Sequence, residues 1–299
     1  MRSIRIPATS ANMGPGFDCM GIALCQYNTI SFAFMESGLQ IDLEQHDKAR
    51  IPADARNLVY RVFCRTLQQY GIIPPGVHFS QINHIPPVRG LGSSAACVVG
   101  GVAMANAYMG EKLSVQEIIN LCAAEDGHPD NILPAILGGI AVGCMEGGHV
   151  YYDRFEGPEN LRCAVFVPPF QLPTKKARAA LPKSVPMQDA IFNISRTAMQ
   201  AAAFAHGNLE ILRVTMQDRL HQPYRKPLIA GYDAVMNIAL EHGALAACLS
   251  GAGPTVIAFL DGDNDTYVSA CKNALAAAHL RWHVELLEVD KTGYRITDV

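Results

Sequence analysis

The sequence predicts an α+β protein built from two domains. Residues 1–45 alternate short β-like runs with turns, which indicates a sheet near the start of the chain. From residue 161 to residue 288, strands and helices interleave in the order expected of a split β-α-β, ferredoxin-like layer. A Gly- and Pro-containing segment at 156–160 separates the two patterns. We therefore expect domains at residues 1–157 and 158–299.

Each element is expected from a local pattern. Strands are expected where apolar and β-branched residues run between turn residues, and helices where apolar residues recur every three or four positions. A capping box, Ser114-Val-Gln-Glu117, marks one helix start. The first domain then contains strands at 4–8, 29–35, 39–43 and 77–83, helices at 57–70 and from 93 and 114 onward, and a hairpin at 138–154. The second contains strands at 161–167, 245–249, 255–260 and 282–288, and helices at 187–205, 208–216, 227–241 and 264–279.

Composition limits the class of protein. Hydrophobic residues make up 49% of the 299 residues and charged residues 17%, which is typical of a chain with a substantial core. A net charge of −3 gives no basic footprint for nucleic acid. No apolar stretch suits a secretory signal or a membrane span, and nine scattered cysteines without a Cys-x-x-Cys pair predict neither disulfides nor a zinc site. We expect a cytoplasmic protein.

Residues 86–96 read Pro-Pro-Val-Arg-Gly-Leu-Gly-Ser-Ser-Ala-Ala. Gly90 and Gly92 allow positive φ angles and a close approach of the backbone to a ligand. A helix that begins at the two serines would direct its free N–H groups at an anion, most often a phosphate. No Gly-Lys-Ser/Thr occurs in the chain, so this is not a Walker A loop. A simple glycine turn before a buried helix is the alternative.

Residues 125–131 read Glu-Asp-Gly-His-Pro-Asp-Asn. Three carboxylates, an imidazole and an amide in seven residues are hard to explain by structure alone, since each needs solvent or a partner. A solvated helix end is the alternative. Residues 7–18 are so rich in Pro, Gly, Ser and Asn that we expect an ordered loop there. Cations also cluster at 174–178 and 218–225, and a glycine turn follows at 250–255.

Three of these stretches resemble motifs of known kinases. Residues 86–96 closely resemble the central phosphate loop of the GHMP kinase superfamily. Residues 7–18, with Met13 where Leu is typical, and residues 126–131 resemble motifs of its homoserine kinase family. The resemblance runs from residue 4 to about residue 260. It implies the GHMP kinase fold, with an N-terminal ribosomal-protein-S5-like domain and a C-terminal ferredoxin-like domain.

The resemblance also implies ATP-dependent phosphorylation of L-homoserine with Mg²⁺, by a protein that is commonly a homodimer. Another small-molecule GHMP kinase, a related decarboxylase and a catalytically silent ligand sensor remain alternatives. The resemblance places ATP against Asn57, Pro87, Arg89, Gly90, Leu91, Gly92, Ser93, Ser94 and Ala95. It places the substrate against Asn12, Asp18, His128, Asn131, Thr174, Arg178, Arg225 and Gly251. Asn57 could instead serve only as a helix cap.

The metal and catalytic residues implied by the resemblance include one open choice. Mg²⁺ would take a hydroxyl from Ser93 or Ser94 and one carboxylate. The family has a single Glu before the Gly of its motif, whereas this chain has Glu125-Asp126, so Asp126 matches by position and Glu125 by residue type. The catalytic set is Glu125, Asp126, Asp130 and Asn131. Asp130 and His128 are the candidate bases in this motif, whereas the resemblance implies direct attack without a dedicated base.

Overall fold

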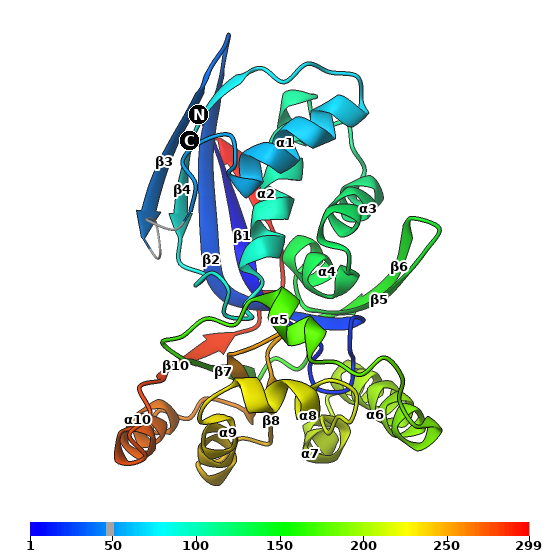
Figure 1. Ribbon diagram of the computed structural model, residues 1–299, viewed down its shortest axis with the longest axis vertical. Helices are drawn as coiled ribbons and strands as arrows, with labels where there is room; N and C mark the ends of the chain where they lie inside the picture. Colours follow the sequence, from blue (N-terminus) through cyan, green and yellow to red (C-terminus); the bar gives the residue numbers. More distant parts are fainter. Residues whose placement is uncertain (46–50, 299) are drawn as a thin grey trace.

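A computed structural model describes residues 1–45 and 51–298 of the chain (Figure 1). The first sheet contains strands β1 (Arg2–Ala11), β2 (Met20–Met35), β3 (Leu39–Gln45), β4 (Gly76–Asn83) and β11 (Arg295–Asp298) in the order β11-β1-β2-β4-β3. β5 (Ile140–Glu146) pairs with β2, and β6 (His149–Phe155) pairs with β5. Only the β3–β4 pair of this sheet is parallel within the described residues.

Four helices cover one face of this sheet (Figure 1). They are α1 (Leu58–Gln69), α2 (Ser93–Tyr108), α3 (Val115–Asp126) and α4 (Pro129–Leu137). α2 lies deepest because two of its glycines leave no room for a side chain. A Cβ on Gly100 would lie 2.3 Å from Ile30, and one on Gly101 would lie 2.7 Å from the Val59 carbonyl of α1. The middle of α2 is thereby held firmly between the sheet and α1.

The second sheet is antiparallel, with the order β10-β7-β9-β8. Its strands are β7 (Leu161–Val167), β8 (Ala246–Leu249), β9 (Val256–Asp261) and β10 (His283–Glu288). This is the strand order of a ferredoxin-like layer, so that expectation is confirmed. The helices of this half are α5 (Thr174–Ala179), α6 (Met187–His206), α7 (Leu212–Thr215), α8 (Gln222–Arg225), α9 (Tyr232–Glu241) and α10 (Tyr267–Ala277), with short 3₁₀ turns at Leu209–Ile211 and Lys226–Leu228.

Two local expectations were wrong at prolines. The loop expected at 7–18 begins only after Ala11, because β1 continues through Pro7. Pro7 is tolerated there because it lies at a β-bulge and beyond the four residues of β1 that pair with β11. α4 was not among the expected helices. Pro129 occupies the first turn of α4, where no backbone N–H is required.

The two halves of the chain are joined by more than one connection. After β10, Val289 forms a bridge with Leu24 of β2, and β11 then joins the edge of the first sheet beside β1. The division at residue 157 remains a prediction, and the structure adds that the segment after β10 packs on the first sheet. None of the described helices is both long and apolar enough to cross a membrane.

Candidate functional site

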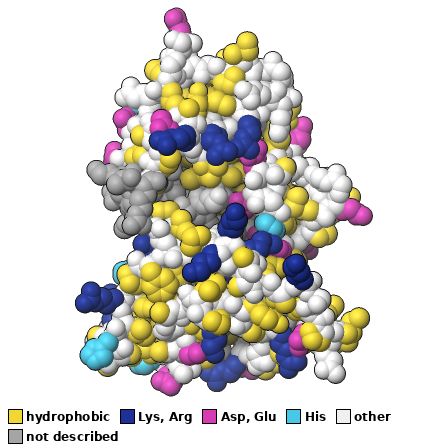
Figure 2. Space-filling view, viewed as in Figure 1, with side chains coloured by type: hydrophobic (Ala, Val, Ile, Leu, Met, Phe, Trp, Pro, Cys, Tyr) yellow, Lys and Arg dark blue, Asp and Glu magenta, His cyan; other side chains and the backbone are white. Residues whose placement is uncertain are grey.

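A cleft of about 680 Å³ lies where segments of both halves meet. Its walls come from the β1–β2 loop, the loop before α2, the α3–α4 junction, α5, α8 and the turn at 251–252. Figure 2 shows Lys and Arg side chains gathered across the middle of this face, at the height of α5. Most of the expected site residues line the cleft: Asn12, Asp18, Asn57, Pro87, Gly90, Gly92, Ser93, Ser94, Ala95, Asp126, His128, Asp130, Asn131, Thr174, Arg178, Arg225 and Gly251.

The loop before α2 has the geometry of an anion cradle. Gly92 is the N-cap of α2 with φ +71°, and no side chain caps this end of the helix. Gly90 has φ +83°, and a Cβ on it would lie 2.3 Å from the Ser250 carbonyl. A Cβ on Gly92 would lie 1.9 Å from the hydroxyl of Thr9. Both glycines are therefore required, and the uncapped N–H groups of α2 remain available to an anion in the cleft.

Two residues expected in this loop do not line the cleft. Leu91 is buried in the core, and its carbonyl accepts a hydrogen bond from the Thr9 N–H at 3.2 Å. Arg89 donates to the carbonyls of Pro87 and Pro168, at 3.2 and 3.3 Å. In this structure the side chains of Leu91 and Arg89 therefore support the loop from outside the cleft.

The carboxylates of Glu125 and Asp126 face different surroundings. Asp126 ends α3 and lines the cleft, where burial raises its pKa to about 6. Glu125 does not line the cleft and forms an ion pair with Arg65 at 2.7 Å. Successive helix residues point about 100° apart, so only one of the two can face the cleft. The geometry favours Asp126 over Glu125 as a cleft ligand.

The donor set suits Mg²⁺ only if a ligand completes it. Within the described part of the chain, no three His, Cys, Asp or Glu side chains gather closely enough to hold a metal ion. Ser93, Ser94 and Asp126 nonetheless offer hydroxyl and carboxylate oxygens in one cleft. These are the hard oxygen donors that Mg²⁺ prefers, and it commonly takes one or two protein carboxylates together with substrate phosphates. The residues present therefore fit a nucleotide-bound Mg²⁺.

The start of α4 carries a second buried carboxylate. Asp130 is 5% exposed, and burial, with the negative charges of Asp18 and Asp126, raises its pKa to about 7. Its Oδ1 accepts a hydrogen bond from the backbone N–H of Asn131 at 2.9 Å. Asn131 in turn accepts one from the Thr9 hydroxyl at 2.7 Å. Thr9 thus connects Asn131 to β1, a contact that the sequence did not reveal.

This buried carboxylate predicts a pH-dependent stability. Asp130 keeps its proton up to about pH 7 when folded, whereas an ordinary Asp has a pKa of 3.8. The folded state therefore holds more protons than the unfolded state between these values, and stability falls as pH rises through that window. Asp130→Asn removes the ionisable group, so we expect it to raise the free energy of unfolding by about 2–4 kcal/mol at pH 8.

Urea unfolding of the ligand-free protein at pH 8 and pH 4 measures the effect. The gain should shrink as the pH approaches 4, because wild-type Asp130 is then neutral in the folded state and already partly protonated in the unfolded state. Asp233→Asn is a control on an exposed carboxylate in the other half of the chain. An equal gain at both pH values would contradict the burial argument.

The opposite end of the cleft contains Asn12, Asp18 and Arg178. Asn12 Oδ1 accepts from the Asp18 N–H at 3.0 Å, and its Nδ2 donates to the Gly251 carbonyl at 2.9 Å. Asp18 forms a bidentate ion pair with Arg178, with N–O distances of 2.9, 3.2 and 3.2 Å. His128 Nε2 lies 3.7 Å from the same carboxylate. Asp18 and Arg178 were both expected to contact the substrate, and here they bind each other across the two halves.

Arg225 is the most deeply buried cation of the cleft. Only 2% of the surface of Arg225 is exposed. Burial, aided by the charge of Arg178, lowers the pKa of Arg225 to about 10. It remains charged at neutral pH. Its Nη1 donates to the Gly251 carbonyl at 3.1 Å and to His221 Nδ1 at 3.2 Å. The ring of Phe17 lies 5.2 Å from the Arg225 guanidinium and 5.6 Å from that of Arg178.

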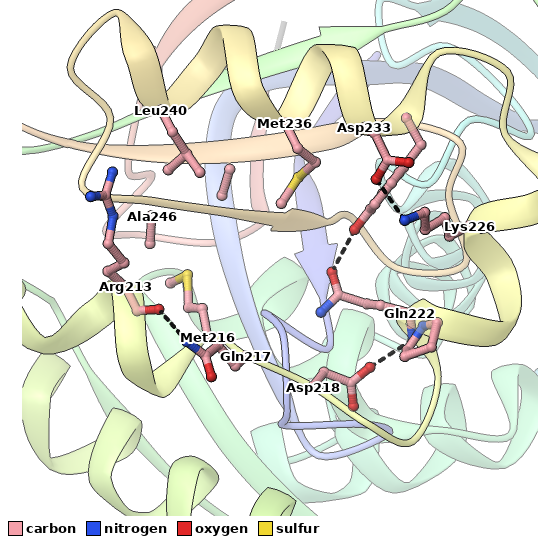
Figure 3. A pocket seen from close by; sticks show the side chains of 13 residues that line it. Arg213, Met216, Gln217, Asp218, Gln222, Lys226, Asp233, Met236, Leu240 and Ala246 are labelled. Atoms are coloured by element: carbon pink, nitrogen blue, oxygen red, sulfur yellow. Dashed lines mark hydrogen bonds and ion pairs between the residues drawn. The ribbon is translucent and has the colours of Figure 1, made fainter.

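Arg225 belongs to α8, and hydrogen bonds of Asp218 and Gln222 hold this helix in place (Figure 3). Asp218 has a fully buried side chain and accepts hydrogen bonds from the N–H groups of Leu220, His221 and Gln222, at 2.8, 3.0 and 2.6 Å. Gln222 Oε1 accepts from the Tyr232 hydroxyl at 3.1 Å and from the Leu249 N–H at 2.8 Å. Asp218 and Gln222 also line a second cavity of about 490 Å³ on this side.

Asn57 lines another part of the cleft, beside Arg56 and several apolar residues. Asn57 caps α1 by accepting from the Val59 N–H at 2.9 Å, and its Nδ2 donates to the Pro52 carbonyl at 2.9 Å. Its polar atoms are thus already bonded, so contact with a base would use the surface of the amide rather than its hydrogen bonds. Ile51, Pro52, Leu58 and Cys97 line the same end.

Comparisons with known proteins place the chain that forms this cleft in a known family. Residues 57–139 match the family described as the GHMP kinases N terminal domain, and residues 200–280 match the GHMP kinases C terminal family. A homoserine kinase of Caldicellulosiruptor saccharolyticus is 45% identical over 100% of this chain and 97% of its own length. That of Caldicellulosiruptor bescii is 46% identical over 100% of this chain and 98% of its own.

A solved structure agrees with these matches. The crystal structure of a homoserine kinase from Cytophaga hutchinsonii superposes with a TM-score of 0.89 at 27% identity, covering 99% of this chain and 96% of that one. The expected two-part α+β fold is confirmed by this likeness and by the two family matches.

Proposed function

Because the chain belongs to the homoserine kinase family of the GHMP kinases, we propose that it transfers the γ-phosphoryl group of ATP to the side-chain hydroxyl of L-homoserine. One observation supports this most directly: a single cleft has a phosphate cradle at one end and charges of both signs at the other. A zwitterionic amino acid fits the charged end, with its hydroxyl turned toward the cradle.

At the nucleotide end, the chain's own groups bind and orient. The N–H groups of residues 90–95 would hold the ATP phosphates at the start of α2, where the helix dipole favours negative charge. Ser93 or Ser94 and Asp126 would hold Mg²⁺, which when bound neutralises charge on the phosphate oxygens. Phosphoryl transfer requires mainly positioning and charge stabilisation, and the close packing of Gly92 against Thr9 fixes the position of the start of α2.

At the substrate end, we propose that Asp18 binds the ammonium group and Arg225 the carboxylate. Asn12 orients Asp18 through its N–H group and contacts Gly251, which also accepts from Arg225. Arg178, now paired with Asp18, can share the substrate carboxylate with Arg225. His128, Asn131 and Thr174 line the same cleft and would complete the contacts around the substrate.

The proposed reaction needs no strong base, because a loose transition state demands little activation of the nucleophile. Asp130 has a suitable raised pKa, but its Oδ1 already accepts the Asn131 N–H. We therefore expect Asp130→Asn to retain measurable turnover, since the amide oxygen can still accept that bond. Steady-state kinetics and homoserine titration on the same variant test this. A complete loss of turnover with unchanged ligand binding would make Asp130 the general base.

A coupled ADP-release assay with a substrate panel tests the function itself. With ATP and Mg²⁺, we expect turnover with L-homoserine and much weaker turnover with L-serine, L-threonine or mevalonate. Turnover with mevalonate alone would point to another GHMP kinase, and ligand binding without ADP release would point to a sensor. We further propose a cytoplasmic homodimer.

A further inference from the structure

The tautomer of the buried His221 is determined by its two partners. The residue has no exposed surface. Its Nδ1 lies 3.2 Å from Arg225 Nη1, and an arginine can only donate, so Nδ1 must be the unprotonated acceptor. Its Nε2 lies 2.7 Å from the Gly14 carbonyl, which can only accept, so Nε2 carries the proton. Burial also lowers the pKa of His221, which favours this neutral form.

The contacts of Arg225 are all on one side of its guanidinium. Nη1 donates both to His221 and to the Gly251 carbonyl. Among the residues that the structure describes, neither Nε nor Nη2 has a hydrogen-bond partner, and Nε is buried. Nε and Nη2 share the edge with which arginine binds a carboxylate through two parallel bonds. The protein thus occupies Nη1 and leaves a two-donor edge unpaired.

Phe17 and Asp218 fix the position of the imidazole itself. The ring of Phe17 stacks on that of His221 at 5.2 Å with an angle of 24° between planes. Asp218 accepts the backbone N–H of His221 at 3.0 Å, and its Oδ2 lies 3.5 Å from Nε2. The imidazole therefore has little freedom to rotate away from Arg225.

We propose that His221 is a positioning residue for substrate recognition: it holds Nη1 of Arg225 so that the Nε–Nη2 edge receives the substrate's carboxylate. This rests on the function proposed above. An arginine binds a carboxylate less tightly when its planar guanidinium is free to rotate, because that freedom is lost on binding. Because His221 is neutral, it fixes the plane of the guanidinium without adding a positive charge of its own beside Arg225.

Two substitutions separate the two nitrogen atoms of His221. The amide of Asn can place an oxygen near the Nδ1 position, so His221→Asn keeps an acceptor for Arg225. The amide of Gln reaches the Nε2 position, so His221→Gln keeps the donor to Gly14 and loses that acceptor. We expect His221→Gln to raise KM for homoserine about 10- to 100-fold, with kcat and the KM for ATP within about threefold of wild type. His221→Asn should recover most of the affinity.

A substrate analogue gives a readout that a general structural defect would not change. L-Homoserine amide lacks the carboxylate, so wild type should discriminate against it strongly. In His221→Gln this discrimination should shrink, because the interaction with the carboxylate is already weakened. Tyr232→Phe is the matched control, since it removes a hydrogen bond behind the same helix without touching Arg225. It should keep the wild-type discrimination.

The outcomes test the positioning role of His221 separately from the proposed homoserine kinase activity. No turnover of homoserine by wild type would contradict the proposed function, whatever the variants do. With an active wild type, equal effects of His221→Gln and His221→Asn, or unchanged discrimination against the amide in His221→Gln, would overturn the positioning role. A parallel loss of ATP affinity in His221→Gln would also overturn it.

Discussion

Arg225→Ala is expected to lower kcat/KM for homoserine by about 30- to several-thousand-fold, while ATP affinity stays close to wild type. Removing one partner of a desolvated, hydrogen-bonded charge pair costs about 2–5 kcal/mol. Arg225 is buried and its Nε has no hydrogen-bond partner in the part of the chain that the structure describes, so a bound carboxylate would depend strongly on it. Homoserine kinetics and nucleotide binding should be measured on the same preparation, after a melting curve shows that it is folded.

Arg225→Lys and Asp18→Ala extend this prediction to both ends of the substrate. Lysine should recover only part of the loss, because an ammonium cannot offer two parallel donors or keep both contacts of Nη1. Asp18→Ala should also depress kcat/KM for homoserine, and it leaves Arg178 without its partner. If the arginine variants lost ATP and kept homoserine, these cations would serve phosphate and our account of the substrate end would be wrong.

Asp126→Ala is expected to lower kcat by about 100- to 1,000-fold, with a much smaller change in the KM for homoserine. Charge stabilisation by a bound metal contributes several kcal/mol to the transition state. Asp126 is the member of the Glu125-Asp126 pair whose carboxylate lines the cleft with Ser93 and Ser94. Its loss should also weaken the dependence of the rate on Mg²⁺ concentration, which a titration of the metal would measure.

Glu125→Ala is the natural control for this prediction. Its carboxylate pairs with Arg65 outside the cleft, so turnover should remain near wild type. The lost surface ion pair should cost at most about 1 kcal/mol of stability. The assignment is reversed if Glu125→Ala loses turnover and Asp126→Ala keeps it, and it is rejected if both variants turn over normally.

Elements defined by short-range chemistry could be predicted from the sequence. The Ser114–Glu117 capping box is present, with Ser114 and Glu117 each bonded to the other's backbone. The ferredoxin-like layer also follows from the alternation of strands and helices. Proline was the main source of error, because its effect depends on position. Pro7 lies beside a bulge that depends on strand pairing, and Pro129 lies in a first helical turn, a position that proline favours and that was overlooked.

The site was predictable as a set of motifs, but not as a network of contacts. Which member of Glu125-Asp126 faces the cleft depends on the rotation of α3 at its last turn, which the sequence does not determine. Phe17 and His221 were not singled out, because their role comes from stacking between segments about 200 residues apart. Thr9 was assigned to a loop rather than to the strand that brings it to Asn131.

The ion pair between Asp18 and Arg178 makes ligand binding an exchange reaction. A ligand ammonium group that binds Asp18, as proposed above, must compete with the guanidinium of Arg178 for that carboxylate. A zwitterion can insert between them and leave both satisfied, so one ion pair becomes two. We therefore expect the cleft to bind amino alcohols and hydroxy acids more weakly than a zwitterionic amino acid, because each lacks one of the two charges.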